Sequence, residues 1–580
     1  MDSSPFSRGR STGVATALAV VACARLLAAD VLPPERRTTW NPGIPGGVPN
    51  RTTVCATLDA ADYGNGAQDA TAAIQAAIDA CPDNQVVLLS AGTFRVDGSE
   101  PITIDRSVVL RGAGPSATRL EKQSSATNPV ILIGQRWRQE AGSANLIVDA
   151  PKGATSVQVT SAAGFAVGQL VVLDKLTDTS YVTWGTNPAA QPGGPARGWF
   201  TRYDRPVGQM LEIASINGNT LSFTTPLHIA FDTAHTAQVT RYTIPYGATY
   251  AGVEDLYVRG GMDDNITVRF AKYSWVKNVE SDWSTGDSTA LDSSFRCVLR
   301  DSYVHDTPFP HPGGAGYMLS VTEYTADSLV ENNIFIRANK VMVMRASGGG
   351  NVIAYNYFDD GYIDYQLDWV ETGLNASHMT TPHFELMEGN QAFNIDGDNT
   401  WGGAVFITYF RNHATGQRRS FVDLANRRAV GLTHGHYDYS FVGNVLGTAD
   451  QDPSPFGSFA YEDLWPWASD PVPMWRLGYT GEDWNAPPEQ RVIDTTHRHG
   501  NFDYATGSVQ WTAGYDQTLP ASLYLSSPPA FFGSDTWPWV NPTGPIKLYV
   551  LPARARYDGL GIFTDGFESG DTSAWSSATP

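Results

Sequence analysis

The sequence predicts an all-β solenoid in which short strands stack as a parallel β-helix, with a short helix at its N-terminal end and a small antiparallel β insertion. Three observations support this fold class. Strands of three to five residues alternate with Gly- and Ser-containing turns after residue 85, and a unit with a central Asn or Asp recurs every 22 to 23 residues after residue 252. The length of 580 residues also suits a solenoid, because its core has no size limit along the axis.

Composition excludes several classes of protein. With 42% hydrophobic and 17% charged residues, the chain is typical of a globular protein and not of a disordered one. The formal net charge is −20, and seven of the 39 basic residues are Lys. Such a surface repels phosphate groups, so we expect neither nucleic acid nor an acidic membrane as a partner.

Residues 1–29 are typical of a secretory signal peptide. Two arginines precede an apolar run over 13–23, and small residues lead to a cleavage site after Ala29. Arg25 interrupts the run before the ~20 apolar residues that a membrane-spanning helix needs, so no transmembrane segment is expected. The protein is therefore expected to be extracellular or periplasmic. The lipobox-like residues up to Cys23 leave open an alternative, a surface lipoprotein anchored at that cysteine.

The lead-in and the first coils follow. Residues 30–50 are rich in Pro and Gly and show no apolar periodicity, so they predict a tail or an extended lead-in. Within 51–145, Asp69 is a good N-cap for a short amphipathic helix over 70–80. Short apolar runs bounded by turns then predict strands at 86–89, 93–96, 102–104 and 108–110.

These N-terminal motifs resemble a known family. Tyr63-Gly64-Asn65-Gly66, the helix from Asp69 to Ile78, Leu89-Ser90-Ala91-Gly92-Thr93-Phe94 and Leu110-Arg111-Gly112-Ala113-Gly114 are similar to the opening of secreted pectate-lyase-like proteins. The resemblance covers about 60 residues. It implies that a short helix caps a right-handed parallel β-helix and that the protein acts on polysaccharides. It does not define a reaction.

Cysteine usage predicts one disulfide. After cleavage the chain keeps Cys55, Cys81 and Cys297, and Cys297 lies within an apolar strand. Cys55 and Cys81 bracket one short segment, which makes them the expected pair in an oxidising compartment. Three cysteines make no metal cluster, and we expect no metal site.

Residues 146–245 have a different sequence pattern from that of the coils. Their short alternating strands, with Asn217-Gly218 as a strong hairpin signal, predict an inserted antiparallel β subdomain. The central coils span 246–450. The residues 451–560 are expected to wrap the surface and add a last coil, and 561–580 form a polar tail.

The central period is counted from one recurring turn. The interpretation places the Asn or Asp of each unit in one column, because Asn and Asp tolerate left-handed backbone in turns. Three enlarged turns, at 307–323, 361–383 and 416–436, interrupt the period and are expected to wall a groove. The residues of the column are Asp255, Asn278, Asp301, Asn333, Asn356, Asn390, Asn412 and Asn444.

A polar column lies three to six residues beyond these turns, where successive coils should stack about 4.8 Å apart. Its members are Asp282, His305, Asp306, Arg337, Asp359, Asp360, Asn394 and Asp396. Acid, base and cation side chains at that spacing define the candidate site. The alternative is that these groups form only turn hydrogen bonds and an ion-pair ladder.

Two chemistries fit the column. Glycoside hydrolysis needs two carboxyl groups and no cofactor, and Asp306, Asp359 and Asp360 supply them. Elimination beside a uronate carboxylate needs a base, here His305 or Arg337, and a cation such as Ca²⁺ held by the aspartates. Hydrolysis is preferred, because the column is rich in Asp and poor in Lys.

Aromatic side chains near the column predict sugar contacts. Trp283, Tyr317 and Trp369 lie just beyond structural turns, and we expect them, with Asp282 and Asp396, to bind the polysaccharide. The sequence thus predicts a monomeric, secreted, polysaccharide-cleaving enzyme. The alternative from another class is a non-catalytic glycan-binding surface protein.

Overall fold

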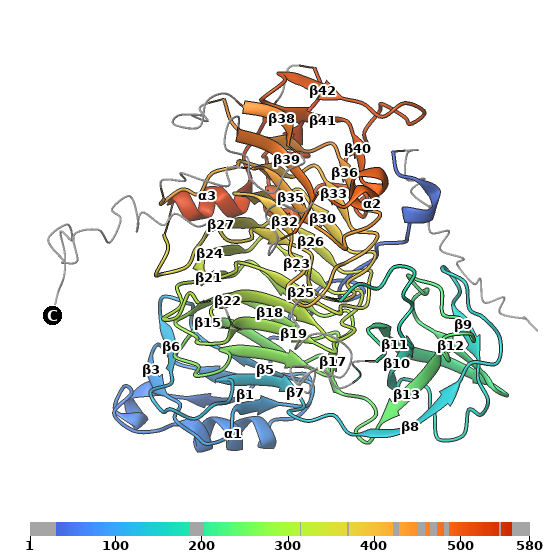
Figure 1. Ribbon diagram of the computed structural model, residues 1–580. Helices are drawn as coiled ribbons and strands as arrows, with labels where there is room; N and C mark the ends of the chain where they lie inside the picture. Colours follow the sequence, from blue (N-terminus) through green and yellow to red (C-terminus); the bar gives the residue numbers. More distant parts are fainter. Residues whose placement is uncertain are drawn as a thin grey trace, which may run out of the picture.

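The computed structural model describes residues 31–184, 202, 204–311, 313, 315–367, 370–421, 428–449, 459–463, 472–480, 487–544 and 547–559. They form a right-handed parallel β-helix with an antiparallel domain beside its N-terminal half (Figure 1). The predicted fold class is confirmed. The predicted signal peptide with Cys23, Trp369 and the tail 561–580 lie outside the described residues.

Each coil of the β-helix has three faces. Face A is the first strand of each coil, and its strands pair in parallel from one end of the solenoid to the other. It comprises β1 (Val54–Leu58), β2 (Gln85–Leu89), β5 (Val108–Arg111), the first halves of β15 (Gly252–Arg259) and β18 (Trp275–Asp282), β20 (Val298–Arg300), β23 (Leu329–Glu331), β26 (Val352–Ala354), β30 (Leu386–Glu388), β33 (Thr408–Phe410), β36 (Ser440–Val442) and β40 (His497–His499).

Face B follows face A after a tight turn and is also parallel throughout. It comprises β3 (Gly92–Arg95), β6 (Thr118–Glu121), the second halves of β15 and β18, β21 (Tyr303–His305), β24 (Ile334–Ala338), β27 (Tyr357–Gly361), β31 (Gln391–Ala392), β34 (His413–Ala414), β37 (Val445–Leu446) and β41 (Asn501–Asp503).

Face C closes the coil. Its strands are β4 (Ile102–Ile104), β7 (Ile131–Gly134), β16 (Ile266–Arg269), β19 (Asp287–Asp292), β22 (Tyr317–Thr322), β25 (Val343–Arg345) and β29 (His378–Met379). A second parallel sheet continues this side toward the C-terminal end, with β28 (Leu374–Asn375), β32 (Ile395–Gly397), β35 (Val430–Thr433), β39 (Val472–Tyr479) and β38 (Phe459–Asp463). A continuous apolar core fills the space between the faces.

The predicted Asn/Asp column is wrong in one respect: in the turn between faces A and B, its residues form two neighbouring columns instead of one. The strand register aligns Asp301 with Asn332, and it aligns Asn333 with Ser302 and Asn356. Asn278 and Asn332 donate to Asp255 and Asp301 at 2.7 Å, and these four residues have left-handed φ angles. The residues from Asn333 onward therefore form a second column, one position after the column of Asp255, Asn278, Asp301 and Asn332. The side chains of this second column point into the core.

The inner column is an asparagine ladder. Each Nδ2 donates to the Oδ1 of the next coil at 2.9 to 3.1 Å, and each Oδ1 also accepts a backbone N–H of the coil before. Its members are Asn333, Asn356, Asn390, Asn412, Asn444 and Asn501. Because these amides are buried, each hydrogen bond satisfies a group that would otherwise cost free energy.

The N-terminal end is capped by α1 (Thr71–Ala80). Asp69 accepts the backbone N–H of Thr71 at 3.0 Å, and Ile74 and Ile78 are buried against the first coils. The predicted disulfide joins Cys55 to Cys81 with the Cα atoms 5.6 Å apart, while Cys297 is free and buried. The cap is thereby tied to the first strand.

The lead-in is an ordered strap along the solenoid. Val31 and Leu32 are fully buried. Arg36 donates to the carbonyl of Tyr439 at 2.7 Å, and Gly43 donates to that of Asp327 at 2.7 Å. The strap thus runs back from the C-terminal coils toward the N-terminal ones, and it includes a 3-10 turn, Pro34–Arg36.

The insertion is an antiparallel sheet in the order β8-β13-β10-β11-β12-β9, as predicted for this part of the chain. The strands are β8 (Glu140–Asn145), β9 (Ser156–Gln158), β10 (Leu170–Lys175), β11 (Val207–Asn217), β12 (Thr220–Phe223) and β13 (Gln238–Tyr242). Gly218, at φ 57°, turns the hairpin between β11 and β12. The insertion begins at Glu140, before the predicted start at residue 146.

The remaining elements are short helices and strands. They are η2 (Ala60–Tyr63), β14 (Ala248–Thr249), β17 (Ala271–Lys272), α2 (Gln490–Thr495), β42 (Ser508–Gln510), η4 (Ala530–Phe532), β43 (Val540–Asn541), β44 (Lys547–Leu548) and α3 (Pro552–Gly559). The hairpin of β41 and β42 ends the coil stack (Figure 1). Among the residues described, none of the helices has both the length and the apolar composition needed to cross a bilayer.

Candidate functional site

Face C carries a groove of about 670 Å³ with many charged side chains. The groove crosses β16, β19, β22 and β25. It is lined by Asp263, Asp264, Arg269, Asp287, Ala290, Asp292, Gly313, Tyr317, Thr322, Glu323, Lys340, Arg345, His378, Thr400 and Trp401.

The strand register explains why these side chains gather. One row across four coils consists of Arg269, Asp292, Thr322 and Arg345. A second row consists of Asp287, Tyr317 and Lys340, with Asp264 before it. The residues beside the first row, such as Val268 and Leu291, point into the core. Outward polar and inward apolar positions alternate, as a β-strand requires.

A carboxyl cluster lies at one end of the second row. Burial first, and then the carboxylates of Asp287 and Asp263, raise the pKa of Asp264 to about 8. The hydroxyl of Thr267 donates to Asp264 Oδ2 at 2.6 Å, and the backbone N–H of Asp287 donates to Asp264 Oδ1 at 2.9 Å. At neutral pH Asp264 is therefore a neutral acid beside the carboxyl group of Asp287.

Arginines hold the other carboxylates of the groove. Arg345 Nη2 donates to Asp287 Oδ2 at 2.8 Å. Asp292 accepts from Arg269 Nε at 2.6 Å and lies 3.7 Å from Arg138 Nη1, and Arg138 also pairs with Glu323. Burial raises the pKa of Asp292, but Arg138 and Arg269 outweigh burial and lower it to about 2. The groove thus holds carboxyl groups in both protonation states.

A second polar group lies further along face C. Tyr317 Oη is 3.3 Å from His378 Nε2, and His378 Nδ1 is 2.9 Å from Asp398 Oδ1. Lys340 Nζ donates to Glu371 Oε2 at 2.6 Å. Burial raises the pKa of Asp398, but His378 outweighs it, and the pKa lies well below its usual range.

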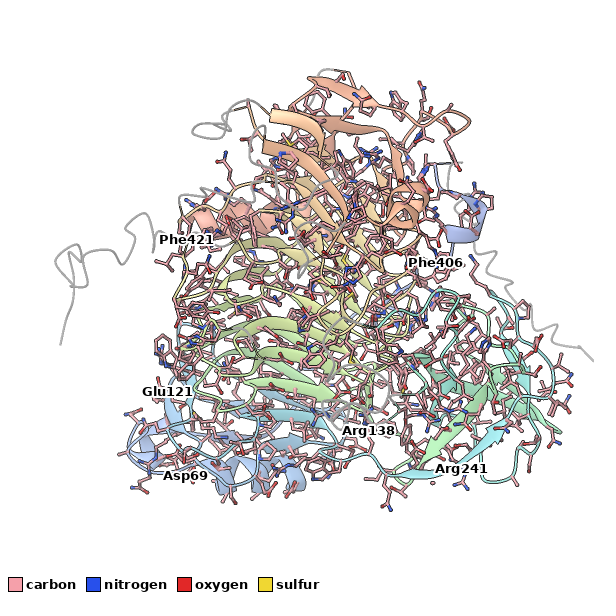
Figure 2. The ribbon with its side chains drawn as sticks, in the orientation of Figure 1. Asp69, Glu121, Arg138, Arg241, Phe406 and Phe421 are labelled. Atoms are coloured by element: carbon pink, nitrogen blue, oxygen red, sulfur yellow. A yellow bond between two sulfur atoms is a disulfide. The ribbon has the colours of Figure 1, made fainter. Side chains whose placement is uncertain are left out.

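Three segments lie at or near the edge of the groove. Gly313 belongs to the loop between β21 and β22, which is the predicted enlarged turn. The insertion contacts the solenoid next to the groove residue Glu323, where Tyr324 Oη donates to the carbonyl of Arg205 at 2.8 Å. Arg138 lies where the insertion leaves the solenoid (Figure 2) and its ion pairs reach across to face C. The groove therefore lies on face C of the solenoid, near its junction with the insertion.

The predicted polar column is present, but it lies on face B. Register aligns Asp282 with His305 in neighbouring coils, and Asp359 follows two coils later, after Ile336. Asp306 accepts from Arg337 Nη2 at 2.6 Å and lies 2.6 Å from His305 Nδ1. Burial raises the pKa of Asp306, but Arg337 and His305 outweigh burial and hold it well below its usual range. The column is a ladder of ion pairs on face B, whereas the groove lies on face C.

Part of this column is covered by other segments. Asp359 Oδ1 accepts the backbone N–H of Arg419 at 3.1 Å, and Asp360 accepts that of Ser420 at 3.0 Å. Both aspartates are buried. Helix α3 lies over the same face, where Tyr557 contacts Tyr357 with ring centres 5.3 Å apart. These contacts give Asp359 and Asp360 a structural role, and their predicted catalytic role stays a prediction.

The predicted substrate-binding residues are dispersed. Tyr317 lines the groove, whereas Asp282 accepts from Tyr257 Oη at 2.6 Å on face B. Trp283 is 46% exposed beside Arg259. Asp396 forms a buried pair with Arg428 at 2.6 Å. Their roles in binding stay predictions.

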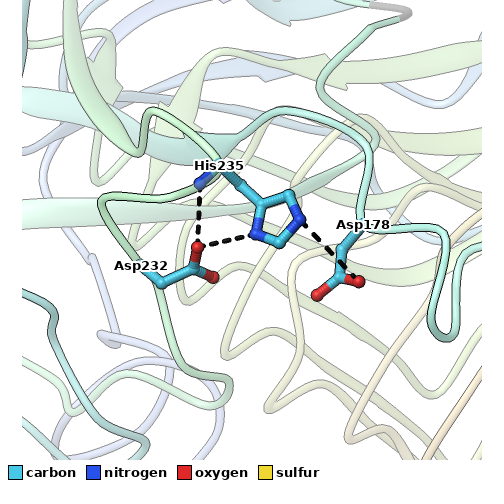
Figure 3. A group of neighbouring side chains, drawn as sticks. All are labelled: Asp178, Asp232 and His235. Carbon is cyan, nitrogen blue, oxygen red and sulfur yellow. Dashed lines mark hydrogen bonds and ion pairs between the residues drawn. The ribbon is translucent and has the colours of Figure 1, made fainter.

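A histidine and two aspartates gather in the insertion (Figure 3). His235 Nδ1 is 2.6 Å from Asp232 Oδ1, and His235 Nε2 is 3.9 Å from Asp178 Oδ1. Their ligand atoms are close enough together to hold a metal ion. However, Lys175 Nζ lies 2.9 Å from Asp232 Oδ2 and 3.5 Å from Asp178 Oδ2. The ammonium group already forms ion pairs with both carboxylates, so we assign this cluster no metal.

Comparisons agree with the fold. Residues 58–174 match the family described as rhamnogalacturonase A/epimerase, pectate lyase-like. The predicted resemblance is confirmed, and the chain has a pectate-lyase-like parallel β-helix. A search of curated protein sequences finds no significant match.

Solved structures are similar only at low identity. The tailspike gp61 of Pseudomonas phage phi297 is 14% identical, with 73% of this chain and 68% of that chain covered and a TM-score of 0.47. The mannuronan C-5 epimerase AlgE4 A-module of Azotobacter vinelandii is 12% identical, with 69% and 90% covered and a TM-score of 0.29. The pectate lyase Pel9A is 11% identical, with 64% and 70% covered and a TM-score of 0.33.

Proposed function

We propose that the protein is an exported enzyme that hydrolyses a polysaccharide in the groove of face C. The observation that carries the proposal is the pairing of Asp264, whose pKa is raised to about 8, with the neighbouring carboxyl group of Asp287, which forms an ion pair with Arg345. Two carboxyl groups whose environments separate their protonation states are the requirement of glycoside hydrolysis. The match to a family described by a rhamnogalacturonase supports a polysaccharide as the substrate.

In this proposal the two carboxyl groups have different roles. Asp264 donates its proton to the glycosidic oxygen as the bond to the anomeric carbon breaks. Asp287, held by Arg345 at 2.8 Å, activates water or attacks the anomeric carbon. Asp264 then takes a proton from the incoming water if a covalent intermediate has formed. Thr267 and the backbone N–H of Asp287 fix the orientation of the acid, which is the positioning that general acid catalysis needs.

The charge of the groove favours an uncharged polysaccharide. Its lining contains five carboxyl groups, Asp263, Asp264, Asp287, Asp292 and Glu323, and three cationic side chains, Arg269, Lys340 and Arg345. Two of the cations are already paired with groove carboxylates and the third with Glu371. These cations are therefore already engaged, and a polyuronate would also meet the protein's charge of −20.

Elimination is the second candidate, because the Tyr317–His378 pair lies beside Lys340. A tyrosine or histidine can act as the base, and a cation can neutralise a uronate. The acidic cluster does not fit the Ca²⁺ that such enzymes use. Thr267, the backbone of Asp287 and Arg345 already occupy carboxylate oxygens that six to eight ligands would require. We therefore propose a reaction that needs no cofactor.

The experiment is a screen of the purified protein against neutral and uronate polysaccharides. New reducing ends measure cleavage, and ultraviolet absorbance measures the unsaturated uronate that only elimination makes. We expect reducing ends without the unsaturated product, unaffected by EDTA and lost in Asp264→Asn. The matched control is Asp255→Asn, because Asp255 lies in the turn between faces A and B, and the amide oxygen of Asn at this position can still accept the hydrogen bond that Asn278 Nδ2 donates. Unsaturated product, or full activity in Asp264→Asn, would contradict the proposal.

We also propose export with removal of residues 1–29, and a monomeric enzyme. The disulfide between Cys55 and Cys81 supports an oxidising compartment. The N-terminal mass of protein from the culture medium tests this, since cleavage after Ala29 and lipidation at Cys23 give different masses. Light scattering after gel filtration measures the oligomeric state.

A further inference from the structure

We propose that Trp137 forms a distal sugar-binding subsite at the N-terminal end of the groove, with its indole face stacked on a ring of the bound polysaccharide. The inference rests on the proposed function and extends it beyond the reacting carboxyl groups. Among the large hydrophobic side chains of the described residues, Trp137 is the most exposed, at 78%. Exposure of that size gives the folded state almost no burial energy, so packing does not explain the residue.

The segment around Trp137 is fixed to the rim of the groove from both sides. Arg269 Nη1 donates to the carbonyl of Arg136 at 3.4 Å. The next residue on the other side, Arg138, pairs with Asp292 and Glu323. Since Arg269, Asp292 and Glu323 line the groove, the backbone of Trp137 is held at its edge. Figure 2 shows Arg138 at the junction of the solenoid and the insertion.

The ring itself is supported on one side. The Arg136 guanidinium lies 5.6 Å from the centre of the Trp137 ring and is tied to Glu100 at 2.5 Å. A cation near an indole stabilises its orientation. With 78% of the side chain exposed, the ring still offers apolar surface to a ligand. A sugar ring has apolar C–H groups on its faces, which match this surface.

The groove also ends at an aromatic residue. Trp401 lines it at the C-terminal end and forms a bridge to Met379 of β29. From β7, which ends three residues before Trp137, to Trp401 the parallel pairing climbs six coils, or about 29 Å at 4.8 Å per step. A polysaccharide along the axis would pass both tryptophans and the Asp264–Asp287 pair between them. The inference therefore predicts preference for long chains.

The test measures binding by affinity electrophoresis in gels with xylan, dextran or polygalacturonate. All variants carry Asp264→Asn, so that no turnover occurs. We expect Trp137→Ala to weaken retardation by the preferred polysaccharide about tenfold and Trp137→Phe to restore part of it. The control is Tyr549→Ala, an exposed aromatic residue of the C-terminal segment that is not part of the groove lining. Thermal unfolding should be unchanged in all of them, since both side chains are exposed.

The outcomes separate this inference from the proposed function. Unchanged binding in Trp137→Ala, or a loss confined to Tyr549→Ala, would overturn the inference while cleavage by the native enzyme still stands. Weakened binding in Trp137→Ala with no cleavage of any polysaccharide would support the subsite and contradict hydrolysis. If the parent protein neither binds nor cleaves any of the polysaccharides, both proposals are wrong.

Discussion

Replacing Asp264 with Asn is expected to stabilise the protein while it removes the activity. The amide fits the same contacts, because its oxygen can accept the N–H of Asp287 and its nitrogen can donate to the hydroxyl of Thr267. The variant cannot ionise, so it avoids the cost of keeping a carboxyl group in a buried, negatively charged site. It also cannot supply the proton that bond cleavage needs.

The magnitude follows from the pKa. The folded protein raises the pKa of Asp264 from 3.8 to about 8, chiefly by burial. A raised pKa contributes stability that is complete below pH 3.8 and is lost as pH rises toward 8. At about 1.4 kcal/mol per pH unit, the loss at pH 7 is on the order of 4 kcal/mol. The advantage of Asp264→Asn should therefore grow with pH over this window.

Urea unfolding of both proteins at several pH values measures this difference, and the initial rate of polysaccharide cleavage measures activity. We expect Asp264→Asn to lower the activity about 10²- to 10⁴-fold. We also expect the unfolding free energy of the variant, relative to that of the native protein, to increase as pH rises. The native activity should also fall above a pH of about 8, where Asp264 ionises. An Asn variant that is less stable at pH 7, or a native rate that rises through pH 8, would refute the assignment.

Further predictions concern the fold and the face B column. Asn356→Ala should lower the unfolding free energy in urea by about 3 kcal/mol or more, because it leaves the buried N–H of Asn333 without an acceptor, whereas Asn278→Ala should cost about 1 kcal/mol; equal losses would contradict the inner ladder. Joint replacement of Cys55 and Cys81 by Ser should cost about 3 kcal/mol, measured as a fall in melting temperature; an unchanged melting temperature would show that the disulfide does not stabilise the cap. Asp306→Asn should lower the melting temperature, because it breaks the pair with Arg337, and should keep kcat/KM near native; lost turnover in a folded variant would restore the predicted catalytic column.

The repeat could be predicted from sequence because stacking imposes it. A coil of 22 to 23 residues places the same turn above itself, and the short apolar runs at 86–89 and 108–110 have no other way to bury both faces. The error of one residue at Asn333 has a simple cause. The enlarged turn after Asp306 hides the register, and Asn332 and Asn333 both satisfy the pattern. Only the strand pairing shows which of them faces the core.

The groove could have been found from the same period. Asp264, nine residues beyond Asp255, and Asp287, nine beyond Asn278, are 23 residues apart, as are Tyr317 and Lys340. The predicted polar column lies three to six residues beyond each turn, and these positions fall on face B. The period shows which residues share a column, but it does not show which column is covered. Residues 419–420 and α3 cover face B through contacts of long sequence separation, which a local pattern does not contain.

The ordered path of the lead-in could not be predicted from the sequence, for a related reason. Residues 31–50 form no strand or long helix, and their order comes from hydrogen bonds to distant coils, such as that from Arg36 to the carbonyl of Tyr439. Each bond satisfies a carbonyl at a turn of the solenoid. Composition rich in Pro and Gly is compatible with both a loose tail and such a strap, so the sequence left both open.

The most direct test of hydrolysis at the face C groove is digestion of the preferred polysaccharide in heavy-oxygen water, with the products analysed by mass spectrometry. Native protein and Asp306→Asn should place one heavy oxygen at each new reducing end, and Asp264→Asn should release no product. Unlabelled fragments that carry an unsaturated uronate would contradict hydrolysis. Labelled product from Asp264→Asn at the native rate, with none from Asp306→Asn, would move the reaction to face B.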